Sequence, residues 1–317
     1  MVTLSKLAKM ANVSISTASK AFSMSPEVNE ETRNMIFDIA KQHGCFKKFY
    51  KAKFPKLVIA IICPEYKSLY YGSLLTALQE ELERRGCDVC VSATNFTCDM
   101  GEELFNYYST YTEVDGIISI GFNISDKGFD FDRVPTVGIG SSCPDNIKCV
   151  MSGALEQAIL YFKRRGVRDI GFIGESLTGS KLRGFRETME KFSLEIDEGL
   201  IGLTEKRFSE GGYAAMSRML DDGGRPRALI CAYDSMAIGA MRCIRERGLR
   251  IPEDIAIIGM DDIPVAKYLY PSLSSIDLKS EEIAASATMA IIGKILGKSY
   301  EIKPISATLN LRESSNL

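Results

Sequence analysis

Short apolar segments rich in β-branched residues alternate with amphipathic segments over most of the chain, and this alternation constrains the fold most. Strand-like runs such as LVIAIIC (57–63), DGIISIG (115–121) and DIAIIGM (254–260) are continuously apolar. Such strands are buried on both faces, which predicts parallel sheets covered by helices. The pattern repeats after residue 152, with helices expected over 179–193 and 234–247. We therefore predict an α/β body of two doubly wound parallel-sheet lobes, with ligands bound in the cleft between them.

The first fifty residues follow a different pattern, that of three short helices. Thr3 can cap a helix that carries an i, i+3, i+4, i+7 apolar stripe, and Asn12 suits the left-handed residue that ends it. Ser14 can cap a second helix, and Asn29 a third that ends at Gly44. Two helices joined by a tight turn and braced by a third predict an all-α helix-turn-helix head.

Charge divides unevenly between the head and the body. Residues 1–56 hold ten Lys or Arg against four acids, a net charge of +6, which leaves −8 for residues 57–317. A basic head suggests an anionic polymer as its partner, since neutralising phosphates releases counterions. If the charge distribution is considered alone, the alternative is that the difference between head and body arose by chance.

Several functional classes are disfavoured by composition. The single histidine, His43, lies in the head, far from every Ser and Cys of the body, so a nucleophile-histidine system is not expected. Nine scattered Cys, including Cys87 and Cys90, indicate reduced thiols in the core rather than a zinc site. No apolar run approaches the length of a membrane span, and the N-terminus lacks signal-peptide features. We predict a cytoplasmic protein that is not an enzyme, with no metal, no cofactor and no membrane partner.

The whole chain resembles the lactose-repressor/galactose-repressor (LacI) family of bacterial transcription regulators. The resemblance is carried by VTLSKLAKMANVSISTASKAF and VNEETRNMIFDIAKQHG in the head, and by VDGIISIG, RDIGFIGE, KLRGF and DSMAIGAMRCIRERGLRIPEDIAIIGMDD in the body. It implies a homodimer, one DNA-binding head per subunit, and a body similar to periplasmic sugar-binding proteins. It also implies an effector between the lobes, such as a sugar or related metabolite.

In the head, the resemblance assigns roles to the second helix, whose N-terminal residues face base edges in such folds. Ile15, Ser16 and Lys20 match base-reading positions; Lys20 could bind guanine, and Ile15 could pack on a thymine methyl. The alternative for Lys20 is a general phosphate contact. Matching phosphate-contacting positions are Thr3, Ser14, Thr17, Ser19, Asn29 and Thr32. Of these, Thr3, Ser14 and Asn29 can also act only as helix caps, and both roles are compatible.

The hinge after the head departs from the family pattern. Lys47 replaces a proline, and Phe54 stands where the family has a leucine that wedges into the minor groove. Pro55 would end a hinge helix directly after Phe54, so insertion of Phe54 stays an open alternative. The lysines of this segment favour phosphate contact: Lys47, Lys48, Lys51 and Lys53.

The effector cleft matches the family only in part. Candidate effector-binding residues are Tyr70, Tyr71, Lys181, Phe208, Tyr233 and Asp261. Lys181 replaces an arginine, and its ammonium lacks the planar, two-pronged hydrogen bonding of a guanidinium. Tyr233 replaces an asparagine. Packing is the alternative role for the tyrosine pair, and Asp234 is expected to cap a helix. These losses of polar groups make an ordinary neutral sugar a weaker expectation.

We predict a DNA-binding domain at 1–46, a hinge at 47–56, and an effector-binding and dimerisation domain at 57–317. Its N-lobe is expected over about 57–151 plus 279–303, and its C-lobe over about 152–276 plus 304–317. The predicted function is a sequence-specific transcription regulator, a repressor, whose affinity for a double-stranded operator changes when a small molecule binds between the lobes. Alternatives are an effector-blind or partner-controlled regulator with a decayed cleft and, less favoured because of the head, a cytoplasmic solute-binding protein.

Overall fold

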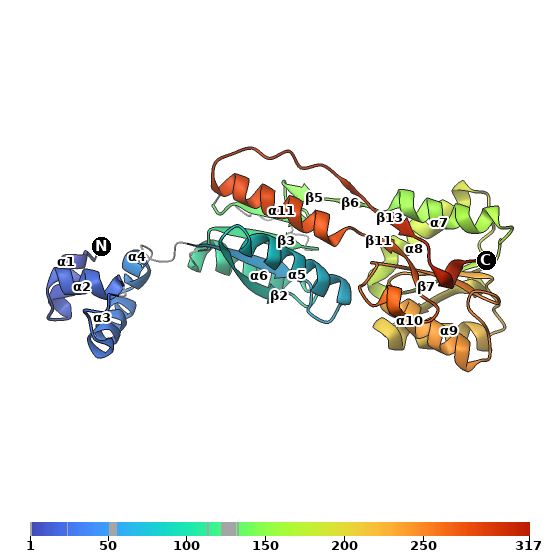
Figure 1. The fold of residues 1–317 in the computed structure, drawn as a ribbon, viewed down its shortest axis with the longest axis horizontal. Helices are drawn as coiled ribbons and strands as arrows, with labels where there is room; N and C mark the ends of the chain where they lie inside the picture. Colours follow the sequence, from blue (N-terminus) through green and yellow to red (C-terminus); the bar gives the residue numbers. More distant parts are fainter. Residues whose placement is uncertain (1, 24, 51–55, 113, 122–130, 132) are drawn as a thin grey trace.

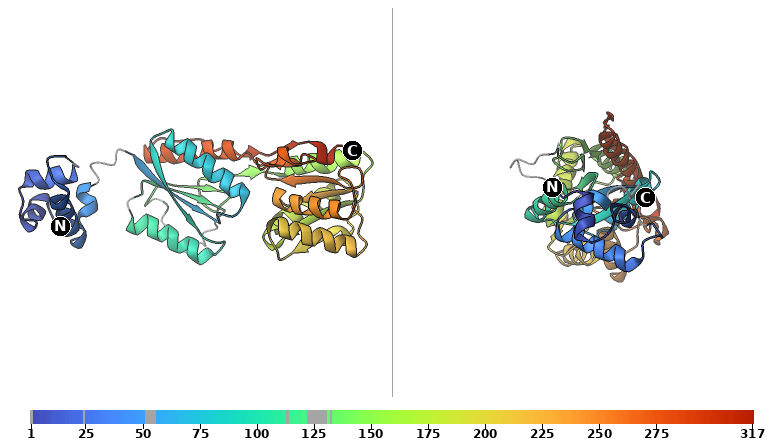
Figure 2. Two further views of the ribbon diagram at one scale, coloured as in Figure 1. Left: turned by 60° about the horizontal axis from the view of Figure 1, so that its bottom comes forward. Right: turned by 90° about the vertical axis from the view of Figure 1, so that its left-hand side faces the viewer.

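The structure of the chain, a computed structural model, describes residues 2–23, 25–50, 56–112, 114–121, 131 and 133–317, without the side chains of Lys47 and Tyr50. A small helical head and two α/β lobes follow one another along the long axis (Figure 1). The left-hand view in Figure 2 shows the same order. The predicted combination of a helical head and a two-lobed body is confirmed.

Within its described residues, the head contains four helices: α1 (Leu4–Met10), α2 (Ile15–Phe22), α3 (Glu30–Gln42) and α4 (Phe46–Tyr50). Three predicted caps are confirmed, because Thr3, Ser14 and Asn29 accept hydrogen bonds from the backbone amides of Lys6, Thr17 and Thr32. Asn12 and Gly44 have the expected positive φ of 52° and 61°.

The fourth head helix was not predicted; it begins at Phe46, the last residue of the predicted DNA-binding domain, and extends into the segment 47–56 that we assigned to the hinge. Phe46 and Phe49 of α4 lie 6.0 and 5.5 Å from the ring of Phe22, so α4 closes the head core. That core includes Leu7 and Ile36, which are fully buried. Packed aromatic rings account for this helix, which is too short to be stable by its own propensity.

The N-lobe is built on a five-stranded sheet in the order β2-β1-β3-β4-β5. Alternate residues of the central strand face opposite sides: Ile59 and Ile61 pack toward α5 and α11, and Ala60 and Ile62 toward α6. Helices therefore cover both faces, as Figure 2 shows. Its elements are β1 (Leu57–Cys63), α5 (Leu69–Glu83), β2 (Cys87–Ala93), α6 (Cys98–Asn106), the π-helix η2 (Tyr107–Tyr111), β3 (Gly116–Ile120), β4 (Thr136–Ile139), β5 (Asn146–Ile147) and α11 (Ser280–Ile295).

The C-lobe is built on a six-stranded sheet in the order β13-β11-β10-β9-β7-β8. Described pairs are parallel except that β13 runs antiparallel to β11, a departure from the all-parallel expectation. Its elements are α7 (Ser152–Arg164), β7 (Ile170–Glu175), η3 (Ser176–Thr178), α8 (Gly179–Lys191), η4 (Glu198–Leu200), β8 (Ile201–Thr204), α9 (Phe208–Asp221), β9 (Ala228–Cys231), α10 (Asp234–Glu246), β10 (Ala256–Met260), η5 (Ala266–Tyr268), β11 (Ser274–Asp277), β13 (Thr308–Asn310) and η6 (Glu313–Ser315).

The chain passes between the lobes at three places that lie together. Strands β6 (Cys149–Val150) and β12 (Ile305–Ser306) pair in parallel. The third crossing leads from β11 to α11, and the Cys149 thiol lies 3.4 Å from the Leu278 carbonyl on it. The three crossings therefore form one connected segment between the lobes.

Helices α9 and α10 approach closely because glycines line their contact. A Cβ on Gly212 would lie 1.9 Å from the Met236 carbonyl oxygen, and one on Gly239 would lie 1.9 Å from that of Ser209. Both obstacles are backbone, so side chains at these positions would force the helices apart. Among the described residues, no helix is both long and apolar enough to span a bilayer.

Candidate functional site

The N-terminal turn of α2 is presented to solvent by the head. Ser14, Ile15, Ser16 and Ser19 are exposed, with Ile15 at 53% of its full accessibility, while Ala18 on the opposite face is buried. The Ser14 hydroxyl caps the helix and lies 2.8 Å from that of Thr17. This turn therefore exposes an apolar side chain surrounded by short hydroxyl groups.

Lys20, the cationic candidate on α2, already has a partner in the free head. Its ammonium forms an ion pair with the Glu27 carboxylate, which lies between α2 and α3. Both side chains are substantially exposed, so water and a competing acceptor can reach the pair. Lys20 is therefore held near the surface of α2 but can exchange partners.

The other candidates in the head and hinge are placed as follows. Asn29 accepts from the Thr32 amide at 2.8 Å, and the N-termini of α2 and α3 both carry capping side chains. Lys48 Nζ donates to the Val2 carbonyl at 3.2 Å, which ties α4 to the start of the chain. The predictions for the side chain of Lys47 and for Lys51, Lys53 and Phe54 lie outside the described residues.

In the C-lobe, Lys181 and Asp261 come together beyond the carboxyl ends of the strands. Lys181 Nζ on α8 donates to the Ala232 carbonyl at 2.6 Å and lies 3.5 Å from Asp261 Oδ1, directly after β10. It also lies 5.9 Å from the ring centre of Tyr233. Burial raises the pKa of Asp261 to about 6, although the Lys181 ammonium opposes this shift. The Asp261 carboxyl therefore keeps its proton to a higher pH than an ordinary aspartate does.

The tyrosine pair at the start of α5 forms the facing part of the N-lobe. The rings of Tyr70 and Tyr71 lie 5.3 Å apart, and Tyr71 lies 6.4 Å from Phe96, which follows β2. Burial, followed by the charge of Asp261, raises the pKa of the Tyr70 hydroxyl and raises that of Tyr71 to about 12. Both phenols stay protonated and can donate hydrogen bonds.

Arg207 bridges the two lobes, and it was not among the predicted residues. Its Nη1 and Nη2 atoms donate to the two Glu65 carboxylate oxygens at 2.7 and 2.8 Å. Glu65 follows β1 in the N-lobe, whereas Arg207 precedes α9 in the C-lobe. The guanidinium carbon also lies 5.0 Å from the ring centre of Phe96 and 4.6 Å from that of Phe208. Arg207 Nε lies 3.4 Å from Glu175 Oε1.

Phe208, a predicted effector residue, lies beside the Arg207 guanidinium and contacts Tyr233. Its amide donates to the Tyr233 hydroxyl at 2.9 Å, and its φ is 57°. Sequence reasoning missed Glu65, Glu175 and Arg207. Glu175 ends β7 and Glu65 follows β1, so the rule that parallel strands direct their carboxyl ends toward ligands could have found both acids.

The expectation that Asp234 caps a helix is wrong. Asp234 is the first residue of α10, and its carboxylate accepts from the Ile263 amide at 2.8 Å and the Ser275 hydroxyl at 2.6 Å. Gly259 permits this approach, because a Cβ there would lie 2.0 Å from Asp234 Oδ1. Burial raises the pKa of Asp234 well above its usual value, and Asp261 adds to the shift. Through these hydrogen bonds the fully buried Asp234 connects α10 to β11 and to the loop after β10.

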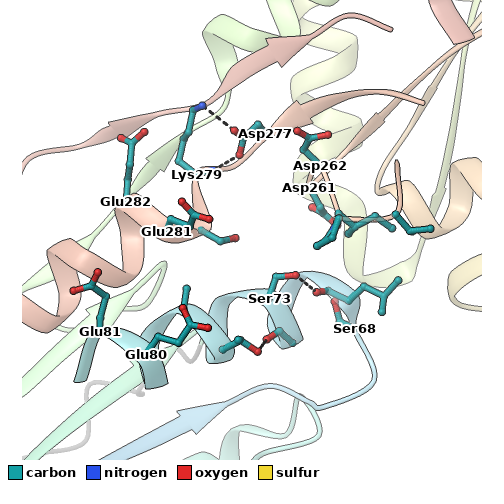
Figure 3. A pocket seen from close by; sticks show the side chains of 18 of the residues that line it. Ser68, Ser73, Glu80, Glu81, Asp261, Asp262, Asp277, Lys279, Glu281 and Glu282 are labelled. Atoms are coloured by element: carbon teal, nitrogen blue, oxygen red, sulfur yellow. Dashed lines mark hydrogen bonds and ion pairs between the residues drawn. The ribbon is translucent and has the colours of Figure 1, made fainter. Parts of the chain in front are cut away.

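A cavity of about 1010 Å³ opens between α5, the C-lobe loop that follows β10, and the crossing from β11 into the start of α11. Figure 3 shows acidic side chains on both sides of it, Glu80 and Glu81 on α5 facing Glu281 and Glu282 on α11. Asp261 is the predicted effector residue that lines this cavity. The other five predicted residues do not line it, and neither do Arg207 and Glu65 of the bridge. Within the described ranges, no group of three or more His, Cys, Asp or Glu is placed to hold a metal ion.

Residues 159–315 match the periplasmic binding protein-like domain. The repressor PurR of Escherichia fergusonii is 28% identical to this chain, over 99% of the chain and 96% of the relative. PurR of Klebsiella pneumoniae subsp. pneumoniae is 27% identical with the same coverage.

Solved structures show the same fold over the full length. A lac repressor dimer bound to operator and an anti-inducer superimposes with a TM-score of 0.73 at 19% identity, covering 99% of this chain and 98% of that one. A complex of the regulator CelR with cellobiose gives 0.67 at 24% identity, covering 99% and 100%. Over its full length the chain is therefore similar to the PurR repressors, and it shares the fold of the lac repressor and CelR structures.

Proposed function

We propose that the chain represses transcription by binding a near-palindromic operator as a homodimer, with a small molecule between the lobes controlling its affinity. The observation that carries this proposal is the exposed N-terminal turn of α2 on a head that has its own core. A protein with this role acts in the cytoplasm and needs no catalytic step.

The head supports base reading through chemistry spread along α2. Ile15 offers an apolar surface for a thymine methyl, Ser16 a short hydroxyl, and Lys20 a cation for guanine O6 and N7. Caps at Ser14 and Asn29 leave the N-termini of α2 and α3 available for phosphate oxygens. Base contacts then supply specificity, and phosphate contacts supply orientation.

Exposed aromatic side chains support a homodimer. Tyr268 and Tyr270 lie on the C-lobe with about four fifths of their surface in water, and Arg245 lies 5.8 Å from the ring centre of Tyr270. Exposed aromatic residues flanked by arginine are typical of protein interfaces. Two copies joined through the body would hold two heads over two half-sites of an operator.

Effector control would act through closure of the lobes. A ligand that contacts Tyr70 and Tyr71 in the N-lobe and Lys181 and Asp261 in the C-lobe would favour one degree of closure. Closure changes the separation of the two heads, and the ligand can shift operator affinity only by its differential affinity for the two states.

Selection of bound duplexes from a random pool by the full-length protein tests this proposal. We expect enrichment of one near-palindromic motif, with information concentrated in two half-sites. A pool that shows no enriched motif after repeated rounds at moderate salt would contradict it.

A further inference from the structure

The Arg207 guanidinium occupies a cage that both lobes build. The N-lobe contributes Glu65 and Phe96, and the C-lobe contributes Glu175 and Phe208. One carboxylate binds the guanidinium through two parallel hydrogen bonds, and two aromatic rings lie within 5.0 Å of its carbon. Planar cations are recognised by this combination of a carboxylate fork and ring faces.

The acids of the cage are more deeply buried than the arginine. Side-chain exposure is 7% for Glu65 and 1% for Glu175, against 28% for Arg207. Glu175 is also fixed by the Leu177 amide, which donates to it at 2.8 Å, and by the Ser176 hydroxyl at 3.2 Å. Arg207 stands at the start of α9 on a long side chain that can reach solvent.

This asymmetry decides which partner can leave. Withdrawal of Arg207 into water keeps its charge solvated, but it leaves two buried carboxylates that need another cation. An anion competing for Arg207 would strand Glu65 instead. The cage therefore selects for a replacement cation.

We infer that the Arg207 side chain occupies the binding site of a cationic effector group. A small molecule that bears a guanidinium or ammonium group would replace the Arg207 guanidinium between Glu65 and Glu175. In the free protein the Arg207 side chain links the lobes; in the bound protein the ligand cation makes the same link to both. This inference rests on the proposed effector control and names the chemical class of the effector.

The test is chemical rescue in the full-length chain with Arg207→Ala. We expect this variant to melt at a lower temperature, and ethylguanidinium to raise its Tm by about 2–4 °C at tenfold above its Kd. Neutral ethylurea, of similar shape, should leave the Tm unchanged. The wild-type chain should need at least about tenfold more probe, because its own tethered arginine competes.

Two further variants serve as controls. In Arg207→Ala combined with Glu65→Gln, ethylguanidinium should no longer raise the Tm, because residue 65 then lacks the two carboxylate oxygens that accept from a guanidinium. Arg186 donates through Nη1 and Nη2 to the Glu198 carboxylate at the exposed surface of the C-lobe. We expect ethylguanidinium to leave the Tm of Arg186→Ala unchanged. A folded Arg207→Ala protein that does not respond to ethylguanidinium, or that responds equally to ethylurea, would overturn the inference.

If Arg207→Ala does not fold, Glu65→Gln still tests whether Arg207 links the two lobes. Hydrogen exchange should then accelerate in C-lobe peptides spanning 205–212, although the substitution lies in the other lobe. Unchanged exchange there would overturn the lobe-to-lobe link.

Operator selection by the wild-type chain is scored separately, so a chain that binds operator but shows no rescue refutes only this inference. Rescue without any operator preference refutes only the proposed function.

Discussion

The Lys20 ammonium, the candidate base reader, is paired with the Glu27 carboxylate in the free head. Operator binding must therefore exchange a carboxylate for a base edge or a phosphate. We expect Glu27→Gln to raise affinity for DNA several-fold, because Lys20 then has no internal competitor. Fluorescence anisotropy with operator and random duplexes measures the effect. Asp38→Asn removes an equal charge from the head's Asp38–Lys41 pair, and an equal gain there would show that only net charge matters.

Lys20→Ala should relax base preference rather than abolish DNA binding. Loss of a lysine–guanine contact costs about 1–3 kcal/mol at one base position. Lys48→Ala is the matched comparison, since Lys48 is expected to contact phosphate: it should weaken all duplexes about equally and flatten the salt dependence. Affinities for single-base operator variants distinguish the two. An equal loss across all variants for Lys20→Ala would reject its reading role.

Asp261 predicts a pH dependence of stability. Its pKa in the folded chain, about 6, lies above the unfolded value of 3.8, so the folded state binds this proton more tightly. The free energy of unfolding should therefore fall as pH rises from about 4 to about 6, and Asp261→Asn should remove up to about 3 kcal/mol of that fall. Urea unfolding of both proteins across this range measures the difference.

Asp254 provides the control for this titration. Its hydrogen bonds to Arg250 lower its pKa to about 2, so Asp254→Asn should alter the pH dependence only below about pH 4. A difference between wild type and Asp261→Asn that stays constant from pH 4 to 7 would show that Asp261 keeps an ordinary pKa.

The contact between α9 and α10 predicts a steric effect at Gly239. A methyl group there would meet the Ser209 carbonyl oxygen at 1.9 Å, and overpacking of this kind costs about 1–3 kcal/mol or more. Gly239→Ala should lower the Tm of the body. Gly153→Ala on α7, where an added Cβ would lie more than 4 Å from every atom outside its own stretch of helix, should be neutral or stabilising by up to about 1 kcal/mol. Equal melting of the two variants would contradict the close helix contact.

Local rules predicted the elements that depend on local chemistry. Caps at Thr3, Ser14 and Asn29 and the left-handed Asn12 follow from side-chain hydrogen bonding and backbone preference within a few residues. Continuous apolar runs likewise predicted strands such as β1 and β10, because burial on both faces leaves no polar alternation.

Features set by contacts distant in sequence were missed. Helix α4 depends on Phe22 and Phe37 from other helices, and the reversed direction of β13 depends on where the chain returns from the N-lobe. Asp234 looked like a cap because the partners of its carboxylate lie 29 and 41 residues away. The Arg207 bridge spans 142 residues, and no spacing rule relates its two ends.

The most direct test of the account is competition between duplexes for the full-length protein. At about 0.15 M salt, the duplex enriched from a random pool should bind at least about 10³-fold more tightly than a shuffled duplex of equal length. Equal affinity for the two duplexes, with and without added metabolites, would contradict the claim that this head reads sequence.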